Sequence, residues 1–362
     1  MRDEVELMRT VNGVLQGKEQ FRNRYPTLIC GGIVQLSDER GGYFDDTEDT
    51  ALAALDIASN DKAHPDSYRV HKRMALKPIG QHISAVKSVD ELIVVAADVM
   101  KVYMEIRNSC NILHRDISDN NVLVYRDGEN NVHGVLIDFD CAIKITDEPR
   151  KATRPVMTGT VPFMSINNLT ESPVCRTALD DWESIIYLLC WIGTQGVNDS
   201  DQLERREKHR LYDLPIGRWS NADARDVRDG KMVHMDSRKN FSMQIVKYFW
   251  TRKSYTPLKS LVCKLYGCLF QNKRLSSSSR GTSADFDELS DSESFNTDYA
   301  NSSDSLSDKA RDYLDGNLDP SIKDPFERRV FFEHEICQQL LDVISKAGEE
   351  AQKRLRESIF EP

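Results

Sequence analysis

Apolar residues recur at two different spacings along the chain, and these spacings predict a mixture of helices and strands. Over residues 3–15 they fall on one face of a helix, with Met8 and Val11 near its centre. The run TLICGGIVQL predicts a strand pair or a strand bent at its two glycines. A further alternating run, YRVHKRMAL, predicts a strand that ends before Pro78. The start of the chain is therefore expected to form one helix and a few strands.

Two strong helical patterns follow these strands. Leu92, Val95 and Val99 begin an apolar stripe of about five turns, and Ser88 with Glu91 fits the capping box that starts many helices. The run DDWESIIYLLCWI is apolar nearly all round, which predicts a helix buried on every side. Such a helix belongs at the centre of a helical unit.

Composition suggests how the chain is organised. Residues 1–80 are expected to form a small unit, in which residues 37–68, rich in Asp, Gly and Ala, form an acidic surface insert. Residues 81–271 are expected to form a larger, mainly helical unit. Residues 272–308 contain too few apolar groups to offset the entropy of ordering, so they are predicted to be disordered. A helical stripe returns in residues 309–362, which are expected to pack on the larger unit.

The overall charge excludes some classes of function. The 362 residues carry a formal net charge of −10, which argues against a surface built for nucleic acid or anionic lipid. The first residues, MRDEVELMRTV, lack the apolar centre of a signal peptide, and no stretch approaches the roughly 18 apolar residues that a membrane span needs. We therefore expect a cytoplasmic or nuclear protein with neither nucleic acid nor membrane as a partner.

The candidate catalytic residues lie in two neighbouring segments, ILHRDISDNNVLV and GVLIDFDCAI. The first holds Asp116 and, five positions later, Asn121, and the second holds Asp138 after an apolar strand. Phosphoryl transfer needs a carboxylate to orient the attacking hydroxyl and oxygen ligands to hold Mg²⁺ on the phosphates. We expect Asp116 to accept the proton of that hydroxyl, Asn121 and Asp138 to hold Mg²⁺ on ATP, and His114 to pack inside the loop. An Asp-rich hairpin without catalytic function is the alternative.

Two features further along the chain support this interpretation. The run GTVPFMS begins at Gly159, and Thr160 within it is expected to reach back towards Asp116. Asp181 opens the predicted buried helix and would hold the backbone of the catalytic loop, because a buried carboxylate needs hydrogen-bond donors. Its neighbour Asp180 could be the anchor instead, or a helix cap.

Four segments together resemble the fungal-type protein kinases, a divergent branch of the protein-kinase superfamily. In chain order they are ILHRDISDNNVLV, GVLIDFDCAI, GTVPFMSINNL and DDWESIIYLLCWI. The resemblance covers roughly Met1 to Phe270. It implies an α+β, two-lobed protein-kinase-like fold with an incomplete small amino-terminal lobe and a mainly helical large carboxy-terminal lobe. It also implies ATP and Mg²⁺ as cofactors and a Ser or Thr of an unknown protein substrate as the phosphate acceptor.

Several positions depart from the usual kinase pattern. Ser118 stands where a typical Ser/Thr kinase carries a Lys that neutralises the transferring phosphate. Asp140 replaces the Gly of Asp-Phe-Gly, either as a third metal ligand or as an acceptor of local backbone hydrogen bonds. The usual Ala-Pro-Glu is absent at Ser165 to Asn167. Arg115 could pair with a nearby carboxylate or with a phosphate on one of four residues, Thr146, Thr153, Thr158 and Thr160.

The nucleotide-binding parts are less complete in this sequence. It contains no GxGxxG run and begins inside the helix that would carry the Glu of a kinase Lys–Glu pair, so we expect an amino-terminally truncated kinase. Glu4 is the best candidate for that Glu and Glu6 the second, although Glu4 could also be a solvated charge. Adenine contacts are expected from the hinge LKPIG, through Leu76, Lys77 and Gly80.

Three functions remain open on the sequence alone. An active protein kinase is favoured by the intact catalytic residues. A pseudokinase that serves as a protein-interaction module is favoured by the missing phosphate-cradling parts. A small-molecule phosphotransferase of the aminoglycoside or choline type would share the fold, but such enzymes tend to carry Gly where Arg115 stands and lack the GTVPFMS run.

Overall fold

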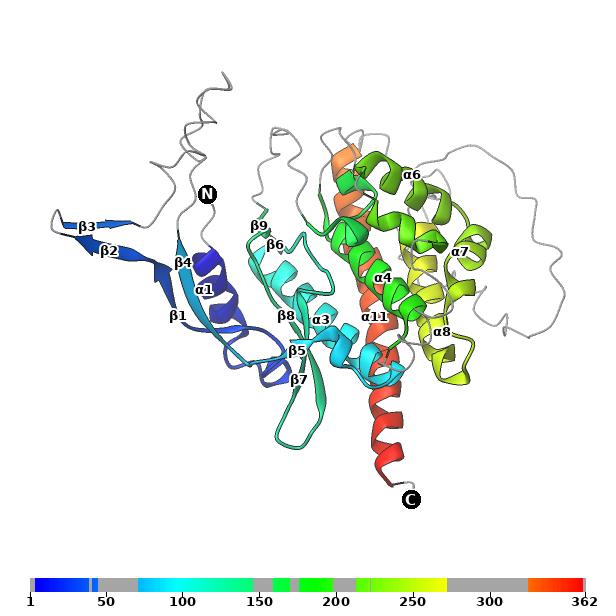
Figure 1. The fold of residues 1–362 in the computed structure, drawn as a ribbon, viewed down its shortest axis with the longest axis horizontal. Helices are drawn as coiled ribbons and strands as arrows, with labels where there is room; N and C mark the ends of the chain where they lie inside the picture. The colour runs from blue at the N-terminus through cyan, green and yellow to red at the C-terminus, as the bar shows by residue number, and fades with distance from the viewer. Residues whose placement is uncertain are drawn as a thin grey trace.

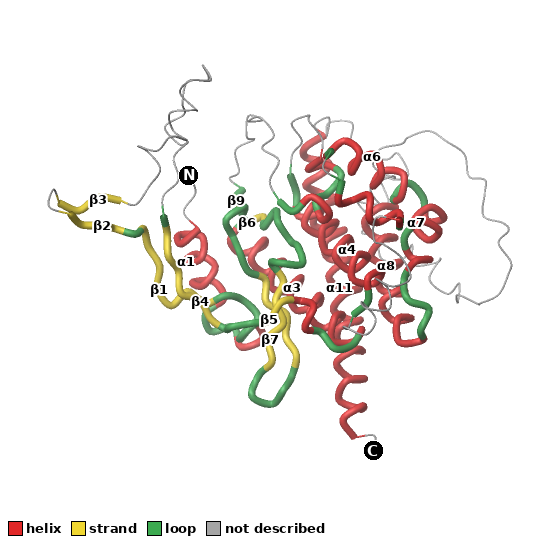
Figure 2. The backbone as a smooth tube through the Cα atoms, in the orientation of Figure 1, coloured by secondary structure: helices red, strands yellow, loops and turns green. Residues whose placement is uncertain are grey.

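The first part of the chain mixes helices and strands, and the rest is mainly helical (Figure 1; Figure 2). This mixture is the expected α+β class. The structure is a computed structural model, and it describes residues 4–38, 41–44, 71–145, 159–169, 176–197, 213–221, 223–271 and 325–360.

Helix α1 (Glu4–Leu15) forms where the sequence predicted a helix, because its apolar positions share one face. The buried residues on this face are Val5, Met8, Val11 and Leu15. Strand β1 (Thr27–Ile33) pairs antiparallel with β4 (Lys72–Lys77) beside this helix. The pairing is irregular between Leu28 and Cys30, so the strand departs from regular geometry before its two glycines, where a bend was expected.

The acidic insert begins with regular structure, which the sequence analysis did not expect. Strands β2 (Gln35–Asp38) and β3 (Gly41–Phe44) pair antiparallel, with Asp38 opposite Gly41. The acidic insert expected over residues 37–68 therefore begins with a pair of strands. Backbone hydrogen bonds define this hairpin, and its polar side chains gave no alternating pattern to detect. The remainder of the insert lies outside the described residues.

The next elements are short strands around a long helix. Helix α3 (Val89–Cys110) begins at Ser88, whose hydroxyl accepts a hydrogen bond from Glu91 N at 3.2 Å. The other half of the expected capping box is wrong, because the Glu91 carboxylate accepts from Lys87 N and pairs with Arg126. The strands are β5 (Gln81–His82), β6 (Ile112–Leu113), β7 (Val122–Arg126), β8 (Val132–Leu136) and β9 (Ile143–Lys144).

The five short strands between residues 81 and 144 form two small sheets. Strand β7 lies between β5 and β8, and β6 pairs with β9. Strand β8 runs so close to α3 that a Cβ atom at Gly134 would lie 2.2 Å from the carbonyl oxygen of Val95. Only glycine fits there, since two backbones meet. The hairpin that follows the catalytic loop is therefore held directly against α3.

Helix α4 (Ala178–Gln195) is buried on nearly all sides, as its sequence predicted. Trp182, Ile186 and Leu189 have no exposed surface. The other helices of this part are α6 (Ala224–His234), α7 (Arg238–Gln244) and α8 (Thr256–Tyr266). Short 3₁₀ helices and one π-helical segment occur along the chain: η1 (Glu19–Phe21), η2 (Ile83–Ala85), η3 (Val161–Phe163), η4 (Asn167–Leu169), η6 (Pro215–Ser220), η7 (Val246–Tyr248), η8 (Lys253–Tyr255) and the π-helical η9 (Gly267–Gln271).

Helix α11 (Pro325–Phe360) packs lengthwise along α3 and also touches α4 and α8 (Figure 1). Its expected stripe is confirmed at Cys337 and Ile344, which are buried in the core. A carboxylate on the same helix is also buried: Glu333 accepts from Ala178 N at 2.7 Å and lies 3.4 Å from Arg107 Nη2. The last helix is thus fastened to the start of α4 and the end of α3. In the ranges that the structure describes, no helix is long and apolar enough to cross a bilayer.

Buried apolar residues form two clusters. The larger one joins α3, α4, α8 and α11. The smaller one joins Met8 and Val11 of α1 to Ile106 of α3 and to Phe139, which follows β8. The first helix is therefore packed against the segment that carries the candidate metal ligand Asp138.

Candidate active site

The candidate catalytic loop is anchored by a buried carboxylate at the start of α4. Asp181 accepts hydrogen bonds from His114 N at 3.0 Å and from Arg115 N at 2.8 Å. Arg115 has a φ of 73°, a left-handed conformation that a residue with a side chain rarely adopts. The two hydrogen bonds hold the loop in this conformation, so Asp181 is the anchor. Asp180 instead accepts from Thr177 N and from the hydroxyl of Ser165.

His114 links the loop to the segment after β8. Its Nε2 lies 3.1 Å from the carbonyl oxygen of Ile137, and Asp116 N donates to its Nδ1 at 3.3 Å. Burial lowers the pKa of His114, and the charge of Asp181 opposes that shift. Burial also raises the pKa of Asp181 to about 6. A neutral ring with its proton on Nε2 satisfies both contacts, and the ring packs edge-on against Phe139.

Asp116 is fixed on both of its carboxylate oxygens. Oδ1 accepts from Thr160 N at 2.8 Å and from the Thr160 hydroxyl at 2.9 Å, and Oδ2 accepts from Asn121 Nδ2 at 3.0 Å. The Asn121 amide also donates to the carbonyl oxygen of Asp116. A Cβ atom at Gly159 would lie 2.8 Å from the carbonyl oxygen of Arg115, so the close approach of this segment needs glycine. The structure therefore assembles Asp116, Asn121 and Thr160, whose catalytic roles stay predictions.

Asn121 and Asp138 are the two residues expected to hold Mg²⁺, and this role stays a prediction. Because the nitrogen of the Asn121 side chain is used by Asp116, its amide oxygen is the atom left to bind a cation. Partial burial and the charges of Asp140 and Asp116 raise the pKa of Asp138. The described part of the chain contains no group of three or more His, Cys, Asp or Glu that could hold a metal by itself. Mg²⁺ can be held by only one or two protein side chains when phosphates and water supply the remaining oxygens.

Asp140 contacts Asp138 through its backbone. Its N–H donates to Asp138 Oδ1 at 3.2 Å. Its own carboxylate is exposed, and its charge acts on both Asp138 and Glu4. A role as a third ligand therefore stays a hypothesis.

Glu4 faces the candidate site from α1. Its Oε1 accepts a hydrogen bond from Phe139 N at 3.1 Å, so the alternative of a purely solvated charge is wrong. Burial and then the charge of Asp138 raise the pKa of Glu4, whereas the charge of Lys72 lowers it. Glu6, the second candidate, is exposed. The lysine whose charge acts on this carboxylate is Lys72, the first residue of β4, and no sequence signal pointed to it.

The expected hinge connects β4 to β5. Leu76 packs against the smaller core, and Lys77 is the last residue of β4. A Cβ atom at Gly80 would lie 2.8 Å from the Cβ of Leu123 in β7, so this end of the hinge touches the strand that follows the catalytic loop. The side chain of Ile79, which precedes Gly80 in the hinge, is 91% exposed. Contacts from this hinge to adenine stay a prediction.

Ser118, the residue that replaces the usual lysine, faces the interior of the protein. Its side chain is completely buried, and its hydroxyl has no hydrogen-bond partner within the described residues. It packs behind the loop because Ile117 and Ser118 turn inward while Asp116 stays partly open to solvent. Ser118 thus does not present a group to a bound phosphate in this structure.

Thr160 is the one described residue among the four threonines that could carry a phosphate for Arg115. The Thr160 hydroxyl is engaged with Asp116, which disfavours it as a site of phosphorylation. The other three, Thr146, Thr153 and Thr158, lie outside the described residues.

Side chains of α4 and α6 hold the GTVPFMS segment in place, and the sequence analysis missed them. Lys231 of α6 is completely buried, and its Nζ donates to the carbonyl oxygen of Met164 at 2.6 Å. The same Nζ lies 4.3 Å from the ring centre of Tyr187, and burial brings the pKa of Lys231 well below its usual value. Glu183 of α4 accepts from Ile166 N at 2.7 Å. These groups position the segment in a chain without the Ala-Pro-Glu glutamate.

No sequence signal pointed to Lys231. It lies in ARDVRDGKMVH, where frequent charges are typical of an exposed helix. The two carbonyl oxygens that it binds lie 67 and 70 positions away in the chain, so only the folded structure brings them together.

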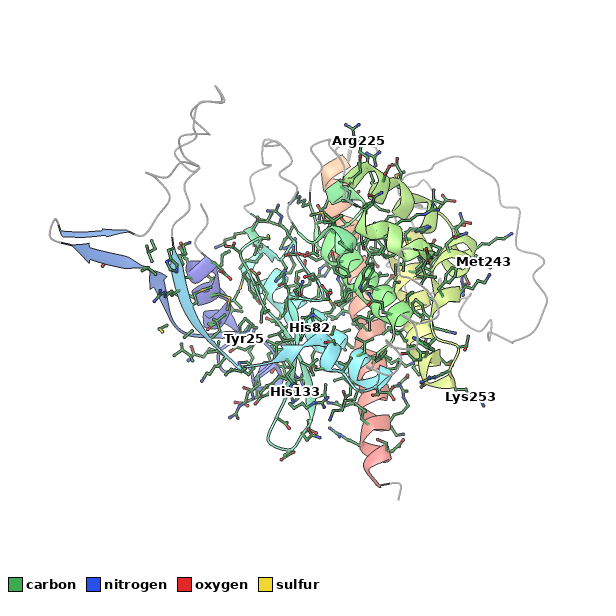
Figure 3. All side chains as sticks on the ribbon, in the orientation of Figure 1. Tyr25, His82, His133, Arg225, Met243 and Lys253 are labelled. Carbon is green, nitrogen blue, oxygen red and sulfur yellow. The ribbon has the colours of Figure 1, made fainter. Side chains whose placement is uncertain are left out.

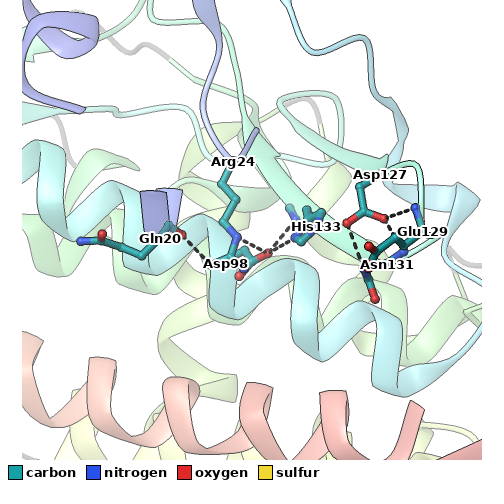
Figure 4. Close-up of polar contacts among 8 residues, drawn as sticks. Gln20, Arg24, Asp98, Asp127, Glu129, Asn131 and His133 are labelled. Carbon is teal, nitrogen blue, oxygen red and sulfur yellow. Dashed lines mark hydrogen bonds and ion pairs between the residues drawn. The ribbon is translucent and has the colours of Figure 1, made fainter. Parts of the chain in front are cut away.

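A polar cluster clamps the turn end of the β7–β8 hairpin onto α3 (Figure 4). His133 lies between two carboxylates: its Nε2 is 3.3 Å from Asp127 Oδ2, and its Nδ1 is 3.5 Å from Asp98 Oδ2. Asp98 also lies 3.3 Å from Arg24 Nε and accepts from Gly134 N. Contact with Asp98, and then with Asp127, raises the pKa of His133.

We expect the clamp to give a pH-dependent contribution to stability. Because the folded pKa of His133 lies above the unfolded value of 6.5, its contribution is complete below that pH and disappears as pH rises through the folded pKa. Thermal melting of His133→Gln should show a loss of about 1 kcal/mol at pH 6 and a smaller loss at pH 8.5. His82→Gln, a change at an exposed histidine, is the control. A deficit independent of pH would contradict the assignment.

Comparison with known proteins identifies the family to which this chain belongs. A family model described as fungal protein kinase matches residues 4–193, slightly more than half of the 362 residues. A search of curated proteins returns no significant match. The matched region contains Glu4, the anchored loop with Asp116, the candidate ligand Asp138 and the anchor Asp181. The chain therefore belongs to the fungal protein kinase family.

Proposed function

We propose that this chain is a protein kinase that transfers the γ-phosphate of ATP to a Ser or Thr hydroxyl of a protein. The observation that carries the proposal is the environment of Asp116, where three donors from Thr160 and Asn121 fix both carboxylate oxygens. Proton acceptance from a substrate hydroxyl depends on such positioning. Family membership supports kinase chemistry in general.

The acidic groups around the loop fit Mg²⁺ as a cofactor. Glu4 and Asp138 have raised pKa values partly because neighbouring carboxylates repel their negative charge. A divalent cation would relieve this repulsion, and Asn121 and Asp138 would hold it. When bound with ATP, it would neutralise charge on the phosphates during transfer. Glu4 would keep the Asp138 segment in place through Phe139 N.

A protein is favoured over a small molecule as the acceptor. The segment that begins at Gly159 lies against Asp116 and is held by Lys231 and Glu183, which gives an ordered surface beside the catalytic carboxylate. Such a surface suits an extended polypeptide.

We expect neither nucleic acid nor membrane as a partner, and a location in the cytosol or nucleus.

A pseudokinase that binds another protein is the second candidate. The observation that favours it is Ser118, which replaces the usual lysine and is buried away from any bound phosphate. Transfer would then lack one source of positive charge.

Two measurements on the purified chain test the proposal. Mg-ATP should raise the melting temperature, and phosphate should appear on Ser or Thr of protein substrates in a mass-spectrometric assay. Binding without transfer to any protein would support the pseudokinase. Absence of both would contradict any nucleotide-dependent function, and transfer only to small molecules would contradict the protein acceptor.

A further inference from the structure

Charge is strongly segregated in the second half of the chain. Residues 237–274 contain nine Lys or Arg and no Asp or Glu, although the whole chain has a net charge of −10. Residues 283–308, here called the acidic segment, contain eight Asp or Glu and no Lys or Arg. Two neighbouring stretches of opposite sign attract each other if the fold allows contact.

The basic stretch surrounds a cavity. Between α7, η7 and α8 lies a hollow of about 340 Å³, here called the basic cavity. Three cations line it, Arg238, Lys247 and Lys259, and the rings of Phe241 and Tyr266 contribute apolar walls. Met243 and Lys253 mark this side of the molecule in Figure 3, where both project at its outer edge.

The interior of the basic cavity carries a positive field. Cys263 lines it, and burial raises the pKa of this thiol, whereas the charges of Arg238 and Lys259 lower it. Both cations therefore act on the same point in the wall. No lining residue is acidic. The cavity thus combines positive charge with aromatic surface, which suits a peptide that carries both carboxylates and apolar side chains.

We propose that the acidic segment docks in the basic cavity of its own chain. The segment carries five acidic residues from Asp285 to Glu293, with Phe286 and Phe295 among and beside them. These groups match the cations and the aromatic walls. The proposal does not depend on phosphate transfer.

The connection between cavity and segment is long enough. Lys259 lies in α8, and the helical path from it to Gln271 covers twelve residues, about 18 Å at 1.5 Å per residue. The fourteen residues from Gln271 to Asp285 can span at most about 45 to 50 Å. The chain can therefore return to the cavity. A tether of this length also keeps the segment at a high effective concentration, which favours it over an equally charged partner.

Carbodiimide cross-linking of the full chain tests the contact directly. This reagent joins an amine to a carboxylate only where the two touch. At low salt we expect bonds from Lys247 or Lys259 to the acidic segment at least tenfold more often than from Lys346, an exposed lysine of α11. The preference should fall in about 1 M salt, where the Debye length is about 3 Å. Equal cross-linking of all three lysines would overturn the proposal.

A mixture of ordinary and ¹⁵N-labelled chains identifies the occupant. Bonds within one chain are expected, and bonds found only between differently labelled chains would show a second copy in the cavity and contradict the proposal.

Thiol reactivity gives a second readout that needs no change to the cavity. In a variant with Asp285, Asp287, Glu288, Asp291 and Glu293 changed to their amides, Cys263 should be alkylated severalfold faster than in the original chain. Cys30, an exposed thiol in β1, is the internal control and should not change. An unchanged rate at Cys263 would contradict docking at this cavity.

Discussion

Asp116→Asn is expected to lower phosphate transfer by roughly 10²- to 10⁴-fold, the usual contribution of a positioned general base. An amide cannot take the proton of the acceptor hydroxyl. It has nearly the same shape as the carboxylate, and its oxygen can still accept from Thr160 N. The fold should therefore survive, and Mg-ATP should raise the melting temperature of the variant as it does for the original chain. Initial rates of phosphate incorporation and thermal melting provide the two measurements.

Asp119→Asn is the matched control for this change. Asp119 lies three positions further along the same loop, and its carboxylate accepts only from its neighbour, Asn120 N, among the contacts described. Transfer should remain within about twofold. Equal activity of Asp116→Asn and the original chain would remove Asp116 from the proposed reaction, and an equal loss in both variants would point to damage of the loop.

Asp181→Ala is expected to lower the free energy of unfolding by about 2 to 4 kcal/mol, because it leaves His114 N and Arg115 N buried without their acceptor. The unusual φ of Arg115 would lose its support at the same time. Phosphate transfer should fall even at temperatures where the variant is folded. Urea unfolding gives the stability, and the transfer assay at low temperature gives the second effect.

Ser184→Ala on the same helix separates the anchor from α4 itself. Ser184 is buried, and among the described residues its hydroxyl donates only to the carbonyl oxygen of Asp180 within its own helix. This change should cost about 1 kcal/mol or less and leave transfer unchanged. If Asp181→Ala were as stable and as active as Ser184→Ala, the loop would not depend on this carboxylate.

Regular patterns made much of the fold predictable. Helices α1, α3 and α4 have apolar residues at helical spacing, and these residues are buried in the structure. The spacing of Asp116, Asn121 and Asp138 pointed to the candidate site because short-range geometry in the loop and hairpin sets their separation. Local sequence carries this information.

Other features arise only from contacts between distant parts of the chain. Lys231 is buried because the carbonyl oxygens of another segment and two aromatic rings surround it. Glu333 bonds to Ala178, 155 positions earlier. Ser118 is inward-facing because of the loop's tertiary packing. A charge or hydroxyl in the sequence does not reveal such partners, since the same residue types are usually exposed.

The position of α11 along α3 has a consequence for synthesis of the protein. The family match ends at residue 193, yet Ile336, Leu340 and Ile344 fill a core that includes α3. A nascent chain that has passed the matched region still exposes the apolar surface that α11 will cover. We expect α3 and α4 to reach their final packing only after residues 325–360 leave the ribosome, which makes the emerging chain a substrate for chaperones until then.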